Sequence, residues 1–383
     1  MSEIELQRIG TNFTGKTCFT HARAAVAPNG SAVMTTQPLR LSGSDIYYGL
    51  HELTSRDGGR NWSEIREVPN LARRPFPGGD GWEIAMADAT PLYHRTTGRF
   101  LLTGASMLYC DDEFVPPPRP RHTVYSTMDP VTGSWSAYRT LDMPDDPEET
   151  FFAGAAGSAQ CLELDNGELL IPFYTMTRKE ACDPWHNSYR AAVMRCGFDG
   201  GTLRFLECGN FLTTPVPRGF CEPSITAYGG RYFLTLRNDE AGFVATGGDG
   251  LHYSDPVEWR FDDGEMLGNY NTQQHWITGG GRLFLVYTRR AGNNDHVFRH
   301  RAPLFIAEVD PERLRVIRST ERIAVPERGA RLGNFGCCRL NDRESWVVAS
   351  EWMQSPGPLG PENLQRCLDH GSDNSIFIAR IRF

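Results

Sequence analysis

An acid and a base flank one short segment of the sequence. Glu222 precedes an apolar run that ends at the turn Gly229-Gly230, and Arg237 follows the next run, Tyr232 to Leu236. A Gly-Gly turn between two such runs predicts a β-hairpin, whose two open ends meet at one edge. Glu222 and Arg237 should therefore face a common site, where a carboxylate can transfer protons and a guanidinium can bind an anion.

The densest polar segment runs from Tyr287 to Arg301 (YTRRAGNNDHVFRHR). Because it directly follows an apolar strand, its first residues should point toward the same edge, and we favour substrate contact over a solvated loop. The candidate contacts in this segment are Arg289, Arg299, His300 and Arg301. His296 and His300 are four positions apart, but no helix is expected here, so we predict no zinc pair. No motif in the sequence indicates a metal, nucleotide or redox cofactor.

The elements that position these residues recur along all 383 residues. Strand–turn–strand units have turns near residues 30, 98, 167, 230, 281 and 342, and in the first five units a further strand leads to an Asp-centred turn. Such a repeat predicts an all-β fold: a six-bladed β-propeller with four-stranded antiparallel blades, forming one domain over residues 1–383. The last strand, Asn374 to Phe383, and the first, Ile4 to Ile9, should complete one blade together.

A propeller gathers the starts of its innermost strands and the ends of its second strands around one axial mouth. The residues at the starts are Arg23, Asp88, Gln160, Glu222, His275 and Asn334, and those at the ends are Gln37, Arg237, Arg289, Arg290 and Glu351. Such a mixture of carboxylates, arginines and a histidine suits an anionic sugar, because arginine binds a carboxylate bidentately while acids transfer protons.

Charge and hydropathy exclude several classes of partner. The net charge is −8 at pH 7, and no run is rich in Lys or Arg, so we expect neither nucleic acid nor an anionic membrane as a partner. No stretch approaches the roughly 18 apolar residues of a membrane-spanning helix. The first residues, MSEIELQRIG, lack the basic and apolar regions of a signal peptide, which predicts a cytoplasmic protein. The oligomeric state stays open.

One motif carries a resemblance to a known family. Ser55-Arg56-Asp57-Gly58-Gly59-Arg60-Asn61-Trp62 matches the Asp-box pattern S-x-D-x-G-x-x-W. With the six hairpins, it makes the chain resemble the sialidase (neuraminidase) superfamily. The resemblance implies that Arg23 and Arg237 belong to a carboxylate-binding triad of arginines, whose third member is Arg289, Arg299 or Arg301. It also implies that Asp45 is the acid/base and that Glu222 is the carboxylate that activates a nucleophile.

The sequence departs from the sialidase pattern at that nucleophile. Sialidases place a tyrosine at the start of the last hairpin, where this chain has Phe335 in the segment GNFGCCRL. Phenylalanine has no oxygen with which to attack or ionise. The departure favours direct attack by water, or replacement of the tyrosine by Tyr270 or Tyr287.

Three functions follow from these residues. The first is a sialidase-like glycoside hydrolase that acts on an acidic glycan, with Asp45 as acid/base. The second is a polysaccharide lyase that cleaves a uronate by β-elimination, with His275 or His300 and Tyr287 as the catalytic pair. The third is a glycan-binding propeller without catalysis, in which Asp45 forms a turn, Glu222 and Arg237 form a structural ion pair, and His275 is a hydrogen-bonded inner-strand residue.

Overall fold

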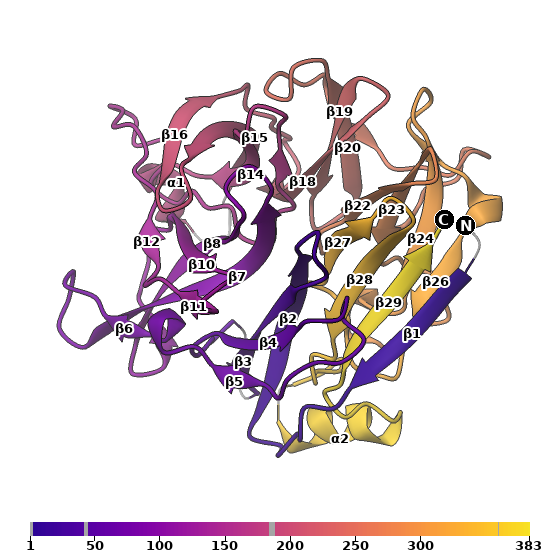
Figure 1. The fold of residues 1–383 in the computed structure, drawn as a ribbon, viewed down its shortest axis with the longest axis horizontal. Helices are drawn as coiled ribbons and strands as arrows, with labels where there is room; N and C mark the ends of the chain where they lie inside the picture. Colours follow the sequence, from indigo (N-terminus) through magenta and orange to yellow (C-terminus); the bar gives the residue numbers. More distant parts are fainter. Residues whose placement is uncertain (1–2, 42–44, 184–187, 359) are drawn as a thin grey trace.

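The computed structural model describes residues 3–41, 45–183, 188–358 and 360–383. The strands within these ranges form six sheets. The sheets follow one another in chain order around a ring (Figure 1), and we number them one to six in that order. The arrangement is an all-β propeller.

The first half of the chain forms sheets one to three. Sheet one is ordered β2 (Thr17–Val26), β3 (Ala32–Arg40), β4 (His51–Ser55) and β5 (Arg66–Glu67). Sheet two contains β6 (Arg74–Pro75), β7 (Trp82–His94), β8 (Arg99–Cys110), β9 (Glu113–Phe114), β10 (Thr123–Asp129), β11 (Ser134–Trp135) and β12 (Arg139–Thr140). Sheet three contains β13 (Leu162–Glu163), β14 (Leu169–Thr175), β15 (Ser188–Phe198), β16 (Leu203–Cys208) and β17 (Arg218–Gly219).

The second half forms sheets four to six. Sheet four is ordered β18 (Cys221–Tyr228), β19 (Arg231–Arg237), β20 (Gly242–Gly247) and β21 (Val257–Glu258). Sheet five contains β22 (His275–Gly279), β23 (Arg282–Tyr287), β24 (Leu304–Asp310), β25 (Arg315–Val316) and β26 (Arg322–Val325). Sheet six contains β27 (Gly336–Asn341), β28 (Glu344–Ser350), β29 (Ile376–Arg382) and β1 (Glu3–Ile9). The helices are α1 (Arg178–Ala181), α2 (Pro361–Asp369) and the 3₁₀ turns Pro69–Leu71, Phe298–His300 and Arg318–Thr320.

The expectation of four antiparallel strands per sheet needs correction. It holds for sheets one, four and six, whereas sheets two, three and five have seven, five and five strands among the described residues. The additional strands are short segments of connecting loops, and one of them, β17, runs parallel to β15. They pair with strand edges whose backbone groups would otherwise need water as a partner.

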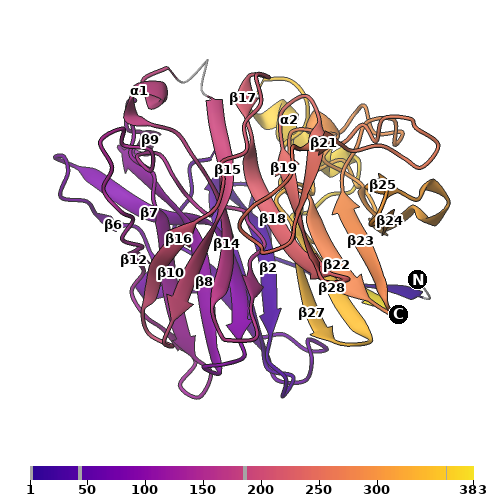
Figure 2. The same cartoon turned by 90° about the horizontal axis from the view of Figure 1, so that it is seen from above.

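Each predicted hairpin turn joins two antiparallel strands: β2–β3, β7–β8, β13–β14, β18–β19, β22–β23 and β27–β28. The inner strands meet around the ring, since β2 contacts β7 and β27, and β18 contacts β14 and β22. They therefore begin at one end of the ring, which we call the axial end. Figure 2 shows α1, β17 and α2 together at one end of the molecule.

The sixth sheet is built from both ends of the chain. β1 pairs with β29 in antiparallel register, from Glu3 beside Arg382 to Ile9 beside Ile376. The two termini consequently lie next to each other at the outer edge of this sheet (Figure 1).

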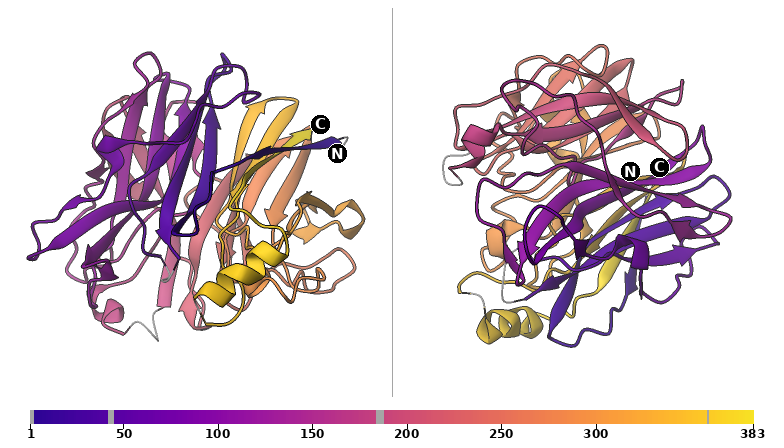
Figure 3. Two further views of the ribbon diagram at one scale, coloured as in Figure 1. Left: turned by 90° about the horizontal axis from the view of Figure 1, so that it is seen from below. Right: turned by 90° about the vertical axis from the view of Figure 1, so that its left-hand side faces the viewer.

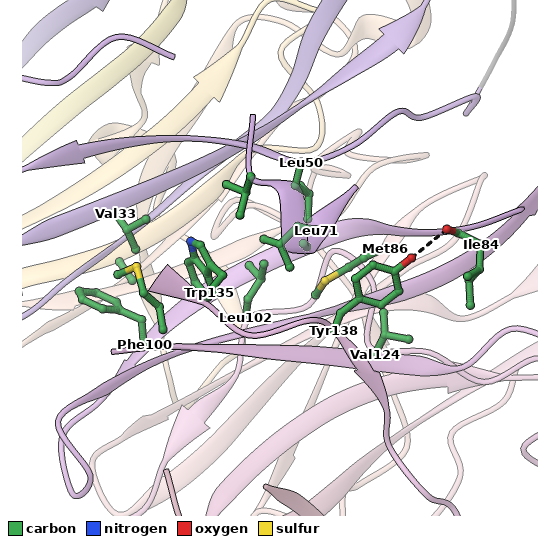
Figure 4. Close-up of a cluster of buried hydrophobic side chains, with 14 of the residues drawn as sticks. Val33, Leu50, Leu71, Ile84, Met86, Phe100, Leu102, Val124, Trp135 and Tyr138 are labelled. Atoms are coloured by element: carbon green, nitrogen blue, oxygen red, sulfur yellow. Dashed lines mark hydrogen bonds between the residues drawn. The ribbon is translucent and has the colours of Figure 1, made fainter. Parts of the chain in front are cut away.

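Apolar side chains fill the space between neighbouring sheets. Because each sheet is covered on both faces, its strands bury both alternating sets of side chains. Figure 4 shows such a cluster between sheets one and two, where Val33 lies with Met86 and Leu102. The buried Tyr138 hydroxyl donates to the Ile84 carbonyl at 2.8 Å in the same cluster.

The segment Ser55–Trp62 folds as a tight turn after β4. Asp57 Oδ1 accepts hydrogen bonds from the Ser55 hydroxyl and from the backbone N–H groups of residues 60 and 61. These bonds, first of all that from the backbone of residue 61, lower the pKa of Asp57 to about 2. Trp62 packs edge-on against Trp346 of sheet six, with ring centroids 6.1 Å apart. The turn therefore links two sheets, and it adjoins the β2–β3 hairpin turn, opposite the axial end.

Helix α2 (Figure 3) packs against the axial end through Cys367, in a cluster with Cys18, Leu39 and Trp352. No helix within the described ranges is both long enough and apolar enough to cross a membrane.

Candidate active site

A left-handed residue lies within or shortly before the inner strand in five of the six sheets. These residues, which are not glycines, have φ between 47° and 69°: His21, Asp88, Ser158, Glu222 and Asn334. In sheets one, two and four the ladder is bulged at this point. Such backbone is strained for a residue with a Cβ, and a bulge redirects a side chain out of the regular pleat. Gln273 takes the corresponding place in sheet five, two residues before the start of β22.

These six residues, which we call the axial ring, are joined by polar contacts. Asn334 Nδ2 donates to His21 Nε2 at 2.5 Å, and His21 Nδ1 lies 3.4 Å from Asp88 Oδ1. Ser158 donates to Asp88 at 3.3 Å. With its amide nitrogen turned toward the oxygens, Gln273 donates to Asn334 at 3.2 Å and to Glu222 at 3.3 Å. The ring therefore brings together two carboxylates, a histidine and two amides from six sheets.

Two residues further along the inner strands lies a second polar layer, which we call the axial plug: Arg23, Gln160, Ser224 and His275. Arg23 is completely buried. Its guanidinium donates to the carbonyls of Phe335, Asp88 and Ala89 and to the hydroxyls of Thr90 and Ser158. The predicted role of Arg23 in binding a substrate carboxylate therefore meets a physical obstacle, because all three of its side-chain nitrogens already donate to groups of the interior.

His275 is occupied in the same way. Its Nε2 lies 3.0 Å from the Phe335 carbonyl, which can only accept, so Nε2 carries the proton. Nδ1 then accepts from the Ser224 hydroxyl at 2.8 Å. Burial, reinforced by the neighbouring Arg23, lowers the pKa of His275 to about 3. His275 is thus a neutral, hydrogen-bonded residue of the plug, and it is not placed to act as the base of a lyase.

Phe335 does not occupy the position expected for a tyrosine nucleophile. Its ring is buried between sheets five and six and stands edge-on to His275, with centroids 4.9 Å apart. The residue that faces the axis in sheet six is the preceding one, Asn334. The register differs by one position because the left-handed turn of the backbone lies at Asn334.

Glu222 and Arg237 meet as the hairpin predicts. Glu222 Oε1 lies 2.6 Å from Arg237 Nη1, and both side chains are buried. Burial raises the pKa of Glu222, but the adjacent Arg237 outweighs it, and the net pKa lies below the ordinary value. Arg237 also contacts Asp239 at 3.1 Å and Asn271 at 3.3 Å. Arg237 is therefore oriented by three partners, and Glu222 is ionised.

A second buried arginine lies beside Arg237. Arg301 Nη2 donates to the Asn271 carbonyl and, at 2.8 Å, to its side-chain oxygen. The same oxygen accepts from Arg237 and, at 3.2 Å, from the exposed Arg299. Burial and the neighbouring cations Arg237 and Arg331 hold the pKa of Arg301 well below its ordinary value. Positive charge at this place thus exceeds the local negative charge.

Arg331, which the sequence did not single out, completes this group. Its side chain is only 2% exposed, and its guanidinium carbon lies 3.2 Å from the ring centroid of Trp352. Nε and Nη2 are buried and have no hydrogen-bond partner among the described residues. Burial lowers the pKa of Arg331 to about 9, so it is still a cation at neutral pH. We call Arg237, Arg301 and Arg331 the arginine cradle.

Asp45 lies near this cradle in a left-handed conformation, with φ of 61°. Its Oδ1 accepts from the Tyr47 hydroxyl at 2.9 Å, and its carbonyl accepts from the Tyr109 hydroxyl at 2.6 Å. Asp45 is only partly buried, and it is among the charges that act on Arg331. The acid expected from the family resemblance therefore stands beside the cationic group.

Three other predicted site residues lie elsewhere. The Gln37 amide bridges sheets one and two by donating to the carbonyls of Tyr48 and Met86. Tyr287 is fully buried, and its hydroxyl donates to Glu321 at 2.5 Å. Arg289 pairs with the same carboxylate at 2.6 Å. The contacts of Gln37 join two sheets, those of Tyr287 and Arg289 stay within sheet five, and none of the three residues contacts the cradle among the described residues.

The remaining expectations concern metals and the loop before β24. No cluster of three or more His, Cys, Asp or Glu residues that could hold a metal ion occurs in the described part of the chain. His300 Nδ1 lies 2.6 Å from the Tyr270 hydroxyl. His296 pairs instead with Glu327 and stacks on His370, so the two histidines point to different partners.

Comparison with known proteins supports the fold. No protein-family model and no curated protein matches this sequence. Among solved structures, Trypanosoma rangeli sialidase is 13% identical over 98% of this chain and 59% of its own, with a TM-score of 0.63. The Hadza microbial sialidase Hz136 is 12% identical over 98% of this chain and 68% of its own, with a TM-score of 0.66. The fold is that of the sialidases.

A third structure of the sialidase fold has no assigned activity. This protein of unknown function from Dyadobacter fermentans DSM 18053 is 13% identical, with both chains covered completely and a TM-score of 0.67. The present chain spans about three fifths of the length of T. rangeli sialidase. Likeness at these identities concerns the sialidase fold, and the chemistry has to come from the site itself.

Proposed function

We propose that this chain is a sialidase-like carbohydrate-active enzyme that hydrolyses a glycan bearing a carboxylate. The observation that carries the proposal is the unpartnered guanidinium of Arg331 in the arginine cradle. A buried cation without acceptors is costly, and a bound carboxylate supplies acceptors in the bidentate geometry that arginine favours. Each of the six sheets would be one blade of the propeller.

The charges around the cradle support an anionic ligand. Arg237 has Glu222 and Asp239 as direct partners. Within the described part of the chain, Arg301 donates only to Asn271, and Nε and Nη2 of Arg331 have no acceptor. Among these residues, two of the three cations therefore lack an anion in contact. A ligand carboxylate between them would offset this charge where burial makes electrostatic interactions strong.

Asp45 is the proposed proton donor to the leaving group. It is partly accessible, unlike Asp88 and Glu222, and the Tyr47 hydroxyl fixes its carboxylate at 2.9 Å. Glu222 has a different task in this proposal. Because it is ion-paired with Arg237 and is linked through Gln273 to Asn334 of sheet six, it orients the cradle.

The test is a panel of glycans with terminal sialic or uronic acids, matched to neutral counterparts. We expect new reducing ends from at least one acidic glycan, none from its neutral counterpart, and no rise in near-ultraviolet absorbance. Arg331→Met should lower kcat/KM by about 10–100-fold through lost ligand binding. The control is Arg74→Met, which removes an exposed arginine stacked at 4.1 Å on Tyr138 and should leave kcat/KM unchanged.

Other outcomes would contradict the proposal. A rise in near-ultraviolet absorbance without hydrolysis would identify a lyase. His275 and Tyr287 are both buried, so such a lyase would need other catalytic residues. Acidic glycans that bind but never give a product would identify a binding propeller. Equal cleavage of acidic and neutral glycans would show that the arginine cradle does not bind a substrate carboxylate.

A further inference from the structure

A tyrosine, a histidine and an aspartate form a chain of contacts next to the arginine cradle. The Tyr270 hydroxyl lies 2.6 Å from His300 Nδ1, and His300 Nε2 lies 3.2 Å from Asp295 Oδ1. Tyr270 directly precedes Asn271, whose side-chain oxygen accepts from Arg237 and Arg301. The chain of contacts therefore begins directly beside Asn271, the residue that bonds both arginines.

The geometry fixes the direction of the hydrogen bonds. A carboxylate oxygen accepts, so in the tautomer that bonds Asp295 the proton of His300 is on Nε2. Nδ1 then presents its lone pair to the Tyr270 hydroxyl, which must donate. This is the arrangement in which a histidine removes the proton of an oxygen nucleophile while a carboxylate orients the ring.

A positive charge also lies over the tyrosine. The Arg290 guanidinium carbon is 3.8 Å from the ring centroid of Tyr270. A cation at this distance from an aromatic face is attracted by the ring and stabilises negative charge that develops on its oxygen. Tyr270 itself is partly exposed.

The loop that carries His300 is held in unusual backbone. Arg299 and His300 are both left-handed, with φ of 56° and 53°. Two successive residues with a Cβ in this region are strained, and such strain persists where the surroundings determine the conformation. The Val297 N–H donates to the Asn294 carbonyl and the His300 N–H to the Val297 carbonyl. These bonds help hold the strained conformation.

We propose that Tyr270 is the nucleophile of this site, with His300 as its base and Asp295 as the residue that orients His300. This inference rests on the proposed hydrolysis of an acidic glycan. Tyr270 Oη would bond to the anomeric carbon as the glycosidic C–O bond breaks. Its proton would pass to His300 Nδ1, and the leaving oxygen would take the proton of Asp45. Water would then attack the same carbon, give a proton to Asp45 and release Tyr270, which regains its proton from His300.

The other tyrosines near the site are less suitable. Tyr47 and Tyr287 are fully buried, and their hydroxyls donate to the carboxylates of Asp45 and Glu321. Burial and these carboxylates raise the pKa of both phenols well above the ordinary value. Among these candidates, Tyr270 combines partial exposure with a neutral base.

The first test needs no glycan. The probe is 4-(fluorosulfonyl)benzoate, whose carboxylate suits the cradle and whose sulfur is attacked by an activated phenol. An O–S bond forms, the S–F bond breaks with loss of fluoride, and the phenol proton passes to His300. We expect one adduct on the peptide that contains Tyr270, and about 10-fold slower labelling in His300→Gln. His296→Gln, in the same loop, should label at the wild-type rate.

Labelling of Tyr270 no faster than labelling of Tyr228, or unchanged labelling in His300→Gln, would overturn the inference. Tyr228 is a suitable internal reference because its hydroxyl donates to the Gly281 carbonyl, which does not act as a base. Thermal unfolding of each variant would show whether the fold is kept.

The second test uses whichever acidic glycan the enzyme cleaves. Tyr270→Phe should lower kcat by about 1,000-fold or more, because a nucleophile is lost while the fold keeps its packing. Wild-type kcat in Tyr270→Phe would overturn the inference and leave the proposed hydrolysis intact. Conversely, rapid labelling of Tyr270 with no glycan cleaved would count against the hydrolysis and support the activated tyrosine.

Discussion

The axial ring and the axial plug use similar residue types in different ways. The four plug residues come from sheets one, three, four and five, each two positions after a ring residue, and both layers contain a cation or a histidine. In the plug, Arg23 has five acceptors and both nitrogens of His275 are bonded. Beside the ring, two nitrogens of Arg331 have no acceptor among the described residues. The number of partners, more than the residue type or burial, separates a structural arginine from a candidate ligand-binding one.

The difference has a backbone origin. Left-handed residues bring the side chains of the ring out of the pleat, in mid-strand in β2 and β7 and at or before the strand start in the other sheets. Two residues later the strands are regular enough to let neighbouring sheets satisfy each other's polar groups. The comparison predicts that substitution of Asp45 or Arg331 beside the ring changes activity, whereas substitution of the fully bonded Arg23 in the plug changes stability.

The largest effect should come from the proton donor. Asp45→Asn keeps the size of the side chain but removes the transferable proton, and we expect kcat to fall by about 100- to 10,000-fold. The free energy of unfolding should change little, because Asp45 is only partly buried. Initial rates on the cleaved glycan and denaturant titration measure the two effects. Asp57→Asn, in the outer turn, is the control for activity, and full activity in Asp45→Asn would remove its assignment.

A substitution in the plug should instead lower stability. Arg23→Met leaves buried carbonyl and hydroxyl oxygens without donors, so the free energy of unfolding should fall by about 3–5 kcal/mol. Arg299→Met, an exposed arginine of the ring's surroundings, should cost less than about 1 kcal/mol. Urea denaturation of both variants tests the contrast. Equal stability of the two variants would show that the number of hydrogen-bond partners of an arginine does not distinguish the plug from the ring.

The Glu222–Arg237 pair should show its own pH dependence. Glu222→Gln should lower the free energy of unfolding by about 1.5–3 kcal/mol at pH 7, because a charged hydrogen bond is lost. The pKa of Glu222 is depressed in the folded state, so its contribution is complete above the unfolded value of about 4.3 and is lost as the pH falls through the folded pKa. Unfolding curves from pH 7 to pH 3 should therefore converge for wild type and variant. A difference in the free energy of unfolding between wild type and variant that grows as the pH falls would contradict the depressed pKa of Glu222.

The smallest effect concerns packing against the plug. A Cβ at Gly336 would lie 2.7 Å from Cγ of Arg23. Gly336→Ala should therefore cost about 1–3 kcal/mol through overpacking. Gly229→Ala is not a suitable control because Gly229 has positive φ, whereas at Gly248 a Cβ would meet nothing within 4 Å. Thermal unfolding of Gly336→Ala and Gly248→Ala provides the comparison, and similar melting temperatures would show that Arg23 can shift.

Much of the architecture was accessible from sequence, because local signals determine it. The Gly- and Asn-containing turns at 30, 98, 167, 230, 281 and 342 each lie between paired antiparallel strands. Turn chemistry and apolar runs are properties of short segments. The pairing of Glu222 with Arg237 follows from the same logic, since a hairpin joins its own ends.

The site itself was harder to predict, because differences of one or two residues in register decide which side chains face the axis. Arg23 and Asn334 were both assigned to the mouth, yet the first belongs to the plug and the second to the ring. His21 was overlooked, although it lies at a similar distance before its hairpin turn as Asp88 does. Arg331 gave no signal, because its importance lies in missing partners. Which acceptors Arg331 can reach is determined only when sheet six packs against its neighbours.

The antiparallel pairing of β1 with β29 has a consequence for how the molecule forms. Sheet six needs strands from both ends of the chain, and their contacts have the longest sequence separation in the protein. Contacts of this kind are slow to form because the whole intervening chain must be organised first. We therefore expect ring closure to be the late step of folding, so that the axial site, which takes residues from all six sheets, is assembled only when the two ends meet.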